Sequence, residues 1–364
     1  MKNGHLMRYL AALIPVFALL AACSSQPKGG TAQPQGNPFK GRSTFLLEPS
    51  HSGTVVGGDF ANNQAANAFV DEMVRKHGFD REQLHSVLAQ AKNLDWVVRL
   101  MDRQAPSTAK GPGGPNGAWI RYRSKFITPA NVQNGVAFWN QYQDELQRAR
   151  QKYGVPPEII VGIIGVETRW GRVMGKTRIL DALATLSFNY PRRARYFSGE
   201  LETFLLMARE EDDDPLDLRG SFAGAMGYGQ FMPSAFKQYA VDFNGDGHIN
   251  LWDPVDAIGS VAHYFQAHGW LTNGTVAVEA SGQAPGLESG FKTRYRVSSL
   301  AAAGLSPDIQ LEKNQQVSLL KFDMGTRYQY WYGLPNFYAI TRYNHSNHYA
   351  MAVWQLGLAV RDAR

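Results

Sequence analysis

A single carboxylate closes a long apolar run in this sequence. Residues 162–171 read GIIGVETRWG, and no side chain between residues 159 and 166 is charged or polar. On a helix, apolar residues would lie one turn before Glu167, and Trp170 one turn after it. Poor hydration raises the pKa of a carboxyl group, and an acid that stays protonated near neutral pH can protonate a leaving oxygen. Glu167 is therefore a candidate general acid.

A structural role for Glu167 is the alternative. Arg169 and Arg172 follow it closely and could pair with it at a helix end. A neighbouring guanidinium would lower the pKa of the carboxyl group and would leave it without a proton to give.

A glycine-rich stretch, GSFAGAMGYGQFMPSAF at residues 220–236, is the second candidate site. Its glycines let the backbone approach a ligand closely. Ser221 and Gln230 offer hydrogen bonds, and Met226 offers an apolar face. The chain has no G-x-G-x-x-G pattern after a strand and no P-loop lysine, so we expect no nucleotide site and no organic cofactor.

The third stretch, VDFNGDGHINLWDPVDA, matches most of an EF-hand loop. Asp242, Asn244, Asp246 and Gly247 fall on loop positions one, three, five and six, which supply hard oxygen ligands and the sharp turn. Position twelve holds Asp253 where the pattern has a longer glutamate. We predict a structural Ca²⁺ site here, with a solvated aspartate turn as the alternative.

The N-terminus predicts export and a lipid anchor. Residues 1–22 combine basic side chains with a short apolar run, which is typical of a signal peptide. The only cysteine, Cys23, ends a segment similar to the bacterial lipobox, and no second cysteine exists to pair with it. Ser24 follows it, which favours the outer membrane, facing the periplasm. Residues 23–58 are rich in Gly, Pro, Ser and Gln and predict a flexible tether.

The composition limits the classes of molecule that this protein is expected to bind. Lys and Arg exceed Asp and Glu by 37 to 31, a net charge of +6, and aromatic residues make up 12 %. A basic balance can indicate nucleic acid, but export would remove DNA from reach. We therefore expect no nucleic-acid partner and favour an anionic envelope polymer or lipid headgroups.

Hydrophobic periodicity predicts an α+β fold that is mainly α. Helical spacing covers residues 65–101 and 130–152, and a new helix starts at the paired prolines of YGVPPEII. Short β-type runs appear after residue 269, followed by a C-terminal helix at about 347–362.

The motifs together resemble a known family. ETRWG followed by GAMGYGQFMPS is similar to the catalytic domain of the lytic transglycosylases of the lysozyme superfamily. With the lipobox and the EF-hand-like loop, the chain resembles the membrane-bound lytic murein transglycosylase B family from about residue 60 to its end. This resemblance implies a lysozyme-like core, a helical domain and a small inserted β domain. The predicted divisions are a helical domain at 59–152, a catalytic core at 153–269 with its calcium loop at 242–256, a β domain at 270–330 and a C-terminal segment at 331–364.

The resemblance also implies a reaction. Glu167 would protonate the bond between N-acetylmuramic acid and N-acetylglucosamine in peptidoglycan and then act as a base, so that a 1,6-anhydro ring forms. Only one carboxylate can be nominated, since the acidic run at residues 209–214 is typical of a solvated surface. The alternatives are a hydrolytic muramidase of the goose-lysozyme kind and a non-catalytic, calcium-stabilised murein-binding lipoprotein.

Further site residues follow from the resemblance alone. The enlarged calcium loop would be closed by Asp256, with the backbone carbonyl of His248 as a ligand, although Asp253 remains the other candidate. Expected partners are glycan strands, the membrane through a lipid on Cys23, and cell-wall synthesis proteins, and we expect a monomer. The sugar-binding groove would be lined by Tyr122, Tyr196, Ser221, Met226, Gln230, Tyr264, Tyr343, Asn344 and Tyr349.

Overall fold

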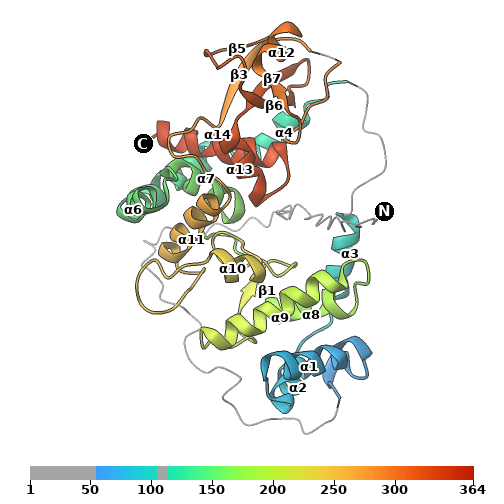
Figure 1. The fold of residues 1–364 in the computed structure, drawn as a ribbon. Helices are drawn as coiled ribbons and strands as arrows, with labels where there is room; N and C mark the ends of the chain where they lie inside the picture. Colours follow the sequence, from blue (N-terminus) through green and yellow to red (C-terminus); the bar gives the residue numbers. More distant parts are fainter. Residues whose placement is uncertain (1–54, 105–113, 285) are drawn as a thin grey trace, which may run out of the picture.

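The computed structural model describes residues 55–104, 114–284 and 286–364, and Cys23 and most of the predicted tether lie outside these residues. The described chain is mainly helical, with one five-stranded sheet at one end, so the predicted α+β class is confirmed (Figure 1). Among the described helices, none combines the length and apolar character that crossing a membrane requires.

The predicted helical stretch at 65–101 consists of three helices. The first, α1, ends where Gly78 adopts a left-handed conformation with φ 64°, and Asp80 then caps the second helix. Helices α1 and α3 contact α8, and Figure 1 shows α1 and α2 at the lower end of the molecule, below α8 and α9. The bounds are α1 Gln64–His77, α2 Arg81–Ala89, α3 Asp95–Arg103, α8 Ile179–Phe188 and α9 Ala194–Glu210, and a short 3-10 helix, η2 Gly58–Phe60, precedes α1.

A buried helix, α7, lies at the centre of the fold. Ten of its twelve residues are buried, and it contacts α5, α6, α11 and α14. Glycines on both helices allow α7 and α14 to cross closely. A Cβ at Gly162 would lie 2.3 Å from the carbonyl oxygen of Val353, and one at Gly357 would lie 1.9 Å from that of Glu158. The C-terminal helix predicted at 347–362 is confirmed by α14. The bounds are α4 Ala118–Arg123, α5 Pro129–Gln141, α6 Gln143–Tyr153, α7 Pro157–Thr168, α11 Pro254–Ala267 and α14 Asn347–Asp362.

The sheet is antiparallel, with strand order β4-β6-β7-β3-β5. Val278, Tyr332 and Leu319 lie in register across its three central strands and form part of a second, smaller hydrophobic core. A helix, α13, leads from the sheet back towards α14. The bounds are β3 Ala277–Gly282, β4 Tyr295–Arg296, α12 Val297–Ala302, β5 Leu305–Pro307, β6 Gln316–Asp323, β7 Tyr328–Gly333 and α13 Pro335–Tyr343.

The contacts of the segment predicted as one helical domain, 59–152, spread over three parts of the molecule. Helices α1 and α3 contact α8, α4 contacts β6 and α14, and α5 and α6 contact α7. The domain boundaries given above stay predictions. The sheet ends at Gly333, three residues beyond the predicted end of the β domain.

Candidate active site

The chain turns sharply directly after Glu167. Helix α7 ends at Thr168, and the next three residues all have positive φ, at 51°, 56° and 82°. Trp170 folds back so that its indole N–H donates to the carbonyl oxygen of Val161 at 3.1 Å. The hydroxyl of Thr168 lies 2.9 Å from the carbonyl oxygen of Tyr228 in the glycine-rich stretch. These bonds fix the last turn of α7 against that stretch, with Glu167 on the side of the pocket.

Glu167 is partly buried, and its surroundings favour the protonated form. Burial raises its pKa from 4.5 to about 7, while a hydrogen bond donated by the hydroxyl of Tyr349 to Oε1 lowers it by less. In the described residues, no ion pair joins Glu167 to Arg169 or Arg172. The geometry therefore favours an acid with a retained proton over an ion pair.

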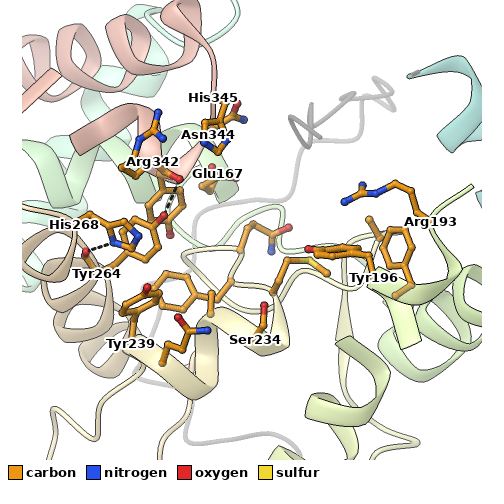
Figure 2. Close-up of a pocket in the computed structure, with 18 of the residues that line it drawn as sticks. Glu167, Arg193, Tyr196, Ser234, Tyr239, Tyr264, His268, Arg342, Asn344 and His345 are labelled. Atoms are coloured by element: carbon orange, nitrogen blue, oxygen red, sulfur yellow. Dashed lines mark hydrogen bonds between the residues drawn. The ribbon is translucent and has the colours of Figure 1, made fainter. Parts of the chain in front are cut away.

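The carboxyl group of Glu167 faces the pocket drawn in Figure 2. The pocket has an empty volume of about 1260 Å³, the open solvent at its mouth included. Its walls come from α9, the glycine-rich stretch, α10 (Pro233–Tyr239), α11 and the end of α13. Among the described residues that line the pocket, Glu167 is the only carboxylate. The pocket therefore presents one proton donor of this kind to a ligand.

Six predicted site residues line this pocket. The side-chain amide of Gln230 donates to the carbonyl oxygens of Gly227 at 2.9 Å and Met174 at 3.2 Å, so it holds two loops together. The carbonyl oxygen of the Asn344 side chain is buried and has no hydrogen-bond partner among the described residues. The six are Glu167, Tyr196, Gln230, Tyr264, Tyr343 and Asn344.

Four predicted sugar-binding residues do not line the pocket as it stands. Met226 is 0 % exposed and lies between two bridge partners, so it supports the loop from behind. The Ser221 hydroxyl accepts from the backbone N–H groups of residues 223 and 225 at 3.2 and 2.9 Å and shapes the same loop. Tyr349 donates its hydroxyl to Glu167, and Tyr122 packs beside Trp119. Direct sugar contact by these four residues stays a prediction.

Sequence reasoning missed several polar side chains of the pocket. Arg342 and His345 flank the predicted pair Tyr343 and Asn344, so a cluster of polar and aromatic letters in TRYNHSNHY was the available signal. Arg193 comes from the opposite wall, where its guanidinium lies 4.3 Å from the ring centroid of Tyr196 (Figure 2). Nothing in its local sequence separates it from other arginines.

The predicted calcium loop forms a compact turn between α10 and α11. Asp242 accepts from the backbone N–H groups of residues 245, 246 and 247, and Asp246 accepts from the N–H of His248. Asp256 is 0 % exposed and accepts from the N–H groups of residues 243, 244 and 250. Asp253 instead caps α11 by accepting from the N–H of Val255 at 2.7 Å. The two aspartates thus have separate structural roles.

The oxygen donors of this loop fit a hard cation in chemistry. Two exposed or half-exposed aspartates, an asparagine and one fully buried carboxyl meet on a turn with positive φ at Gly245 and Gly247. Burial raises the pKa of Asp256 to about 6, more than its three backbone hydrogen bonds lower it, and a nearby cation would favour the ionised form. The side chains bond to the backbone of the loop, and no metal-binding group of three acidic, His or Cys side chains is assembled among the described residues.

The comparison with protein families gives a direct match to this architecture. The family described as the Transglycosylase SLT domain matches residues 61–358. The chain belongs to this family. The predicted resemblance is thereby confirmed, and the matched range includes Glu167, the glycine-rich stretch and the loop at 242–256.

Known relatives are similar over nearly the whole chain. The membrane-bound lytic murein transglycosylase B of Escherichia coli strain K12 is 73 % identical over 359 residues, which is 98 % of each chain. The solved structure of the E. coli lytic transglycosylase Slt35 in complex with bulgecin A is 75 % identical, with a TM-score of 0.83, covering 88 % of this chain and 99 % of that one. Slt35 in complex with calcium is 74 % identical, with the same TM-score and the same coverage.

Proposed function

We propose that this chain is a lytic murein transglycosylase in which Glu167 acts first as acid and then as base. The enzyme would cleave the β-1,4 linkage between N-acetylmuramic acid and N-acetylglucosamine. The observation that carries this proposal is the carboxyl group of Glu167, the only one among the described residues that line the pocket, whose pKa is raised by burial to about 7. The relative at 73 % identity, named a lytic murein transglycosylase, supports the same activity.

The reaction needs one proton to leave Glu167 and one to return. Protonation of the bridging oxygen lets the bond between that oxygen and C1 of the muramic sugar break. The ionised Glu167 then takes the proton of the C6 hydroxyl of the same sugar, and the C6 oxygen bonds to C1. The 1,6-anhydro ring closes, no water is consumed, and Glu167 is protonated again.

A single carboxyl group favours ring closure over a double displacement. A retaining glycosidase ordinarily has a second carboxyl group roughly 5 Å from the acid, which serves as nucleophile. The described lining residues offer none. A hydroxyl of the substrate itself can replace it, because an intramolecular nucleophile has a high effective concentration.

Polar groups around Glu167 suit an N-acetylated sugar. The buried, unpaired carbonyl oxygen of Asn344 is an acceptor for the N–H of an acetamido group. Gln230 holds the loop over which the sugar would lie, and Ser221 fixes the backbone of that loop. The aromatic rings of Tyr264 and Tyr343 form part of the pocket wall, where they offer apolar faces to the sugar.

We also propose that the loop at 242–256 holds a structural Ca²⁺ ion. Asp242, Asn244, Asp246, the carbonyl of His248 and Asp256 would supply oxygen ligands. A bound ion would stabilise the turn between α10, which forms part of the pocket wall, and α11. Slt35, which has been solved in complex with calcium, supports this assignment.

Attachment to the membrane follows from the relative described as membrane-bound. We propose that a lipid on Cys23 provides it, that residues 23–58 act as the tether, and that the enzyme faces the periplasm from the outer membrane. Glycan strands of peptidoglycan are then its substrate, and cell-wall synthesis proteins are candidate partners.

The test is product analysis of purified murein digested by the unlipidated protein and by its Glu167→Gln variant. The wild type is expected to release 1,6-anhydro ends, and the variant to lose at least 100-fold in rate, since general acid–base catalysis contributes about 10² to 10⁴. Mass spectrometry separates anhydro from reducing ends by one water. Reducing ends would instead indicate a hydrolytic muramidase, and full activity of the variant would remove Glu167 from the reaction.

A further inference from the structure

One wall of the pocket carries positive charge that the protein leaves unneutralised. Arg342, His345 and His268 line this wall, and Figure 2 shows Arg342 and His345 on the same side as Glu167. Burial lowers the pKa of both histidines, so the positive charge of the wall comes from Arg342. Lys292 and Arg294 continue the charge on the loop before β4. No ion pair within the described ranges includes any of these five side chains.

Two of these cations are held against one tyrosine ring. Tyr338 and Arg342 lie one turn apart on α13, and the guanidinium carbon of Arg342 lies 4.0 Å from the ring centroid of Tyr338. The guanidinium carbon of Arg294 lies 5.0 Å from the same centroid. Stacking on an aromatic ring orients a guanidinium without neutralising it.

Arg294 also keeps hydrogen-bond donors free, whereas Arg342 donates through Nε to the carbonyl oxygen of Tyr338 at 3.5 Å and through Nη2 to the hydroxyl of Thr341 at 3.0 Å. Arg294 uses only Nη1, which donates to the carbonyl oxygens of Phe291 at 3.1 Å and Thr293 at 3.0 Å. Its Nε and Nη2 groups have no hydrogen-bond partner in the described part of the chain. A guanidinium with two adjacent free donors matches the two oxygens of a carboxylate.

A second hollow adjoins the pocket of Glu167 and is lined by one of these arginines. It has an empty volume of about 680 Å³, open solvent included, and is lined by Arg294, Tyr338 and Ser318 among others. His268 lines both this hollow and the pocket of Glu167, so the two adjoin at this side chain. A group that branches from a sugar beside Glu167 would have to pass His268 to reach Arg294.

We propose that Arg294 and Arg342, stacked on Tyr338, bind a carboxylate of the peptide carried by the muramic sugar. The inference rests on the proposed function and adds a determinant of substrate choice to it. While the lactyl carboxyl of each muramic sugar is bound to its peptide as an amide, the sugars carry no charge, so the anionic groups of a peptide-bearing strand are on its peptides. These two arginines therefore distinguish peptide-bearing strands from bare ones and act on binding, while Glu167 acts on the bond.

The experiment compares three substrates: glycan strands with their peptides, bare strands that an amidase has freed of peptides and whose exposed lactyl carboxyl groups have then been converted to amides, and peptide-bearing strands whose carboxyl groups have been converted to amides. The wild type is expected to show a KM several-fold lower for the native strands than for either of the others. Arg294→Ala is expected to raise KM for the native strands about 10-fold and to leave the bare strands as they are. Arg294→Lys, which keeps the charge but not the fork, should fall between.

Arg296→Ala is the matched control, because Arg296 is an exposed arginine two residues along the same segment. It is expected to behave as the wild type on all three substrates. Equal loss by Arg294→Ala on bare and native strands, or no loss on either, would overturn the inference, as would amidated strands cleaved as well as native ones. Inorganic phosphate that competes with bare strands as strongly as with native ones would also count against a peptide carboxylate. A wild type that releases no anhydro ends from any substrate would instead contradict the proposed function.

Discussion

Glu167 is a partly buried acid and Asp256 a fully buried one, and the groups around them differ. Burial raises the pKa of both, to about 7 for Glu167 and about 6 for Asp256. Glu167 receives one hydrogen bond, from the Tyr349 side chain, and otherwise faces the pocket. Asp256 is 0 % exposed and receives three hydrogen bonds from backbone N–H groups of its loop.

Helix position reinforces this difference. Glu167 lies at the C-terminal end of α7, where the helix dipole disfavours negative charge, while Asp256 lies in the first turn of α11, where the dipole favours it. Burial alone therefore does not make a catalytic acid. A carboxyl group that can give its proton away needs few fixed donors and access to a ligand, and one that anchors a loop needs the opposite.

The largest effect on stability is expected when the carboxyl group of Asp256 is removed. Asp256→Ala leaves three backbone N–H groups without their acceptor, and each unpaired buried donor costs about 1–3 kcal/mol. We expect the free energy of unfolding to fall by about 3–5 kcal/mol, measured by denaturant titration without added metal. A loss below about 1 kcal/mol would show that the loop does not depend on this carboxyl group.

Asp253→Ala is the control for this variant. It removes only the cap of α11, which is worth about 1 kcal/mol. Ca²⁺ is expected to raise the Tm of the wild type and of Asp253→Ala, but not that of Asp256→Ala. An equal response of both variants to Ca²⁺ would mean that Asp256 does not close the site.

Removing the carboxyl group of Glu167, the proposed catalytic acid, is expected to change stability in the opposite direction. Glu167 has a folded pKa of about 7 against an ordinary 4.5, so between these pH values the folded chain keeps a proton that the unfolded chain releases. Stability therefore falls as pH rises through this range, by up to about 3 kcal/mol and less where solvent screens the group. Glu167→Gln lacks this loss. It should be more stable than the wild type at pH 8 by about 1–3 kcal/mol and similar at pH 4.5.

Glu202→Gln is the matched control for that experiment. Lys76 and His77 pair with Glu202 at 2.6 and 2.8 Å and lower its pKa. A lowered folded pKa contributes stability that is present above the ordinary pKa and lost in acid. This variant is therefore expected to be less stable than the wild type at pH 8, and a stabilising effect of both substitutions would contradict the linkage argument.

The positions of several helices and of Glu167 could be predicted, because each depends on residues that are close together in the sequence. The apolar run before Glu167 and the paired prolines define α7, and periodicity placed α14 at its observed bounds. The break of the 65–101 stretch at Gly78 and the division of the 130–152 stretch at Tyr142 were not predicted, since a periodic pattern continues across both. Backbone conformation at single residues decides such breaks.

The side chains that surround Glu167 in the pocket could not be predicted, because they come from segments far away in the sequence. Tyr349 reaches Glu167 across 182 positions of sequence, and nothing in its own neighbourhood marks its hydroxyl as the donor to this acid. Arg193 and Arg342 join the pocket only through the packing of α9 and α13 around it. Met226 lies in the glycine-rich stretch and was predicted to line the groove, but its side chain is buried in the core and supports the loop from within.

The smallest effect is expected from Tyr349→Phe, which removes the only hydrogen bond that the Glu167 carboxyl receives within residues 55–104, 114–284 and 286–364. That bond lowers the pKa of Glu167, so its loss should raise the pKa further above about 7. The protonated acid then persists to higher pH, and the alkaline limb of the pH profile of kcat/KM should move up by roughly one unit, which corresponds to about 1.4 kcal/mol. The activity at the optimum should fall less than 10-fold, which is far less than for Glu167→Gln.

Tyr343→Phe separates this effect from a change in the aromatic wall. The ring of Tyr343 stacks on that of Tyr349, with centroids 6.5 Å apart, but its hydroxyl donates to the carbonyl oxygen of Gly229 and not to Glu167. It should therefore leave the alkaline limb where it is. Only Tyr349 of these two tyrosines donates to Glu167. If the alkaline limb moved equally in both variants, burial alone would set the pKa of Glu167, and the Tyr349 hydroxyl would serve only to orient the carboxyl group.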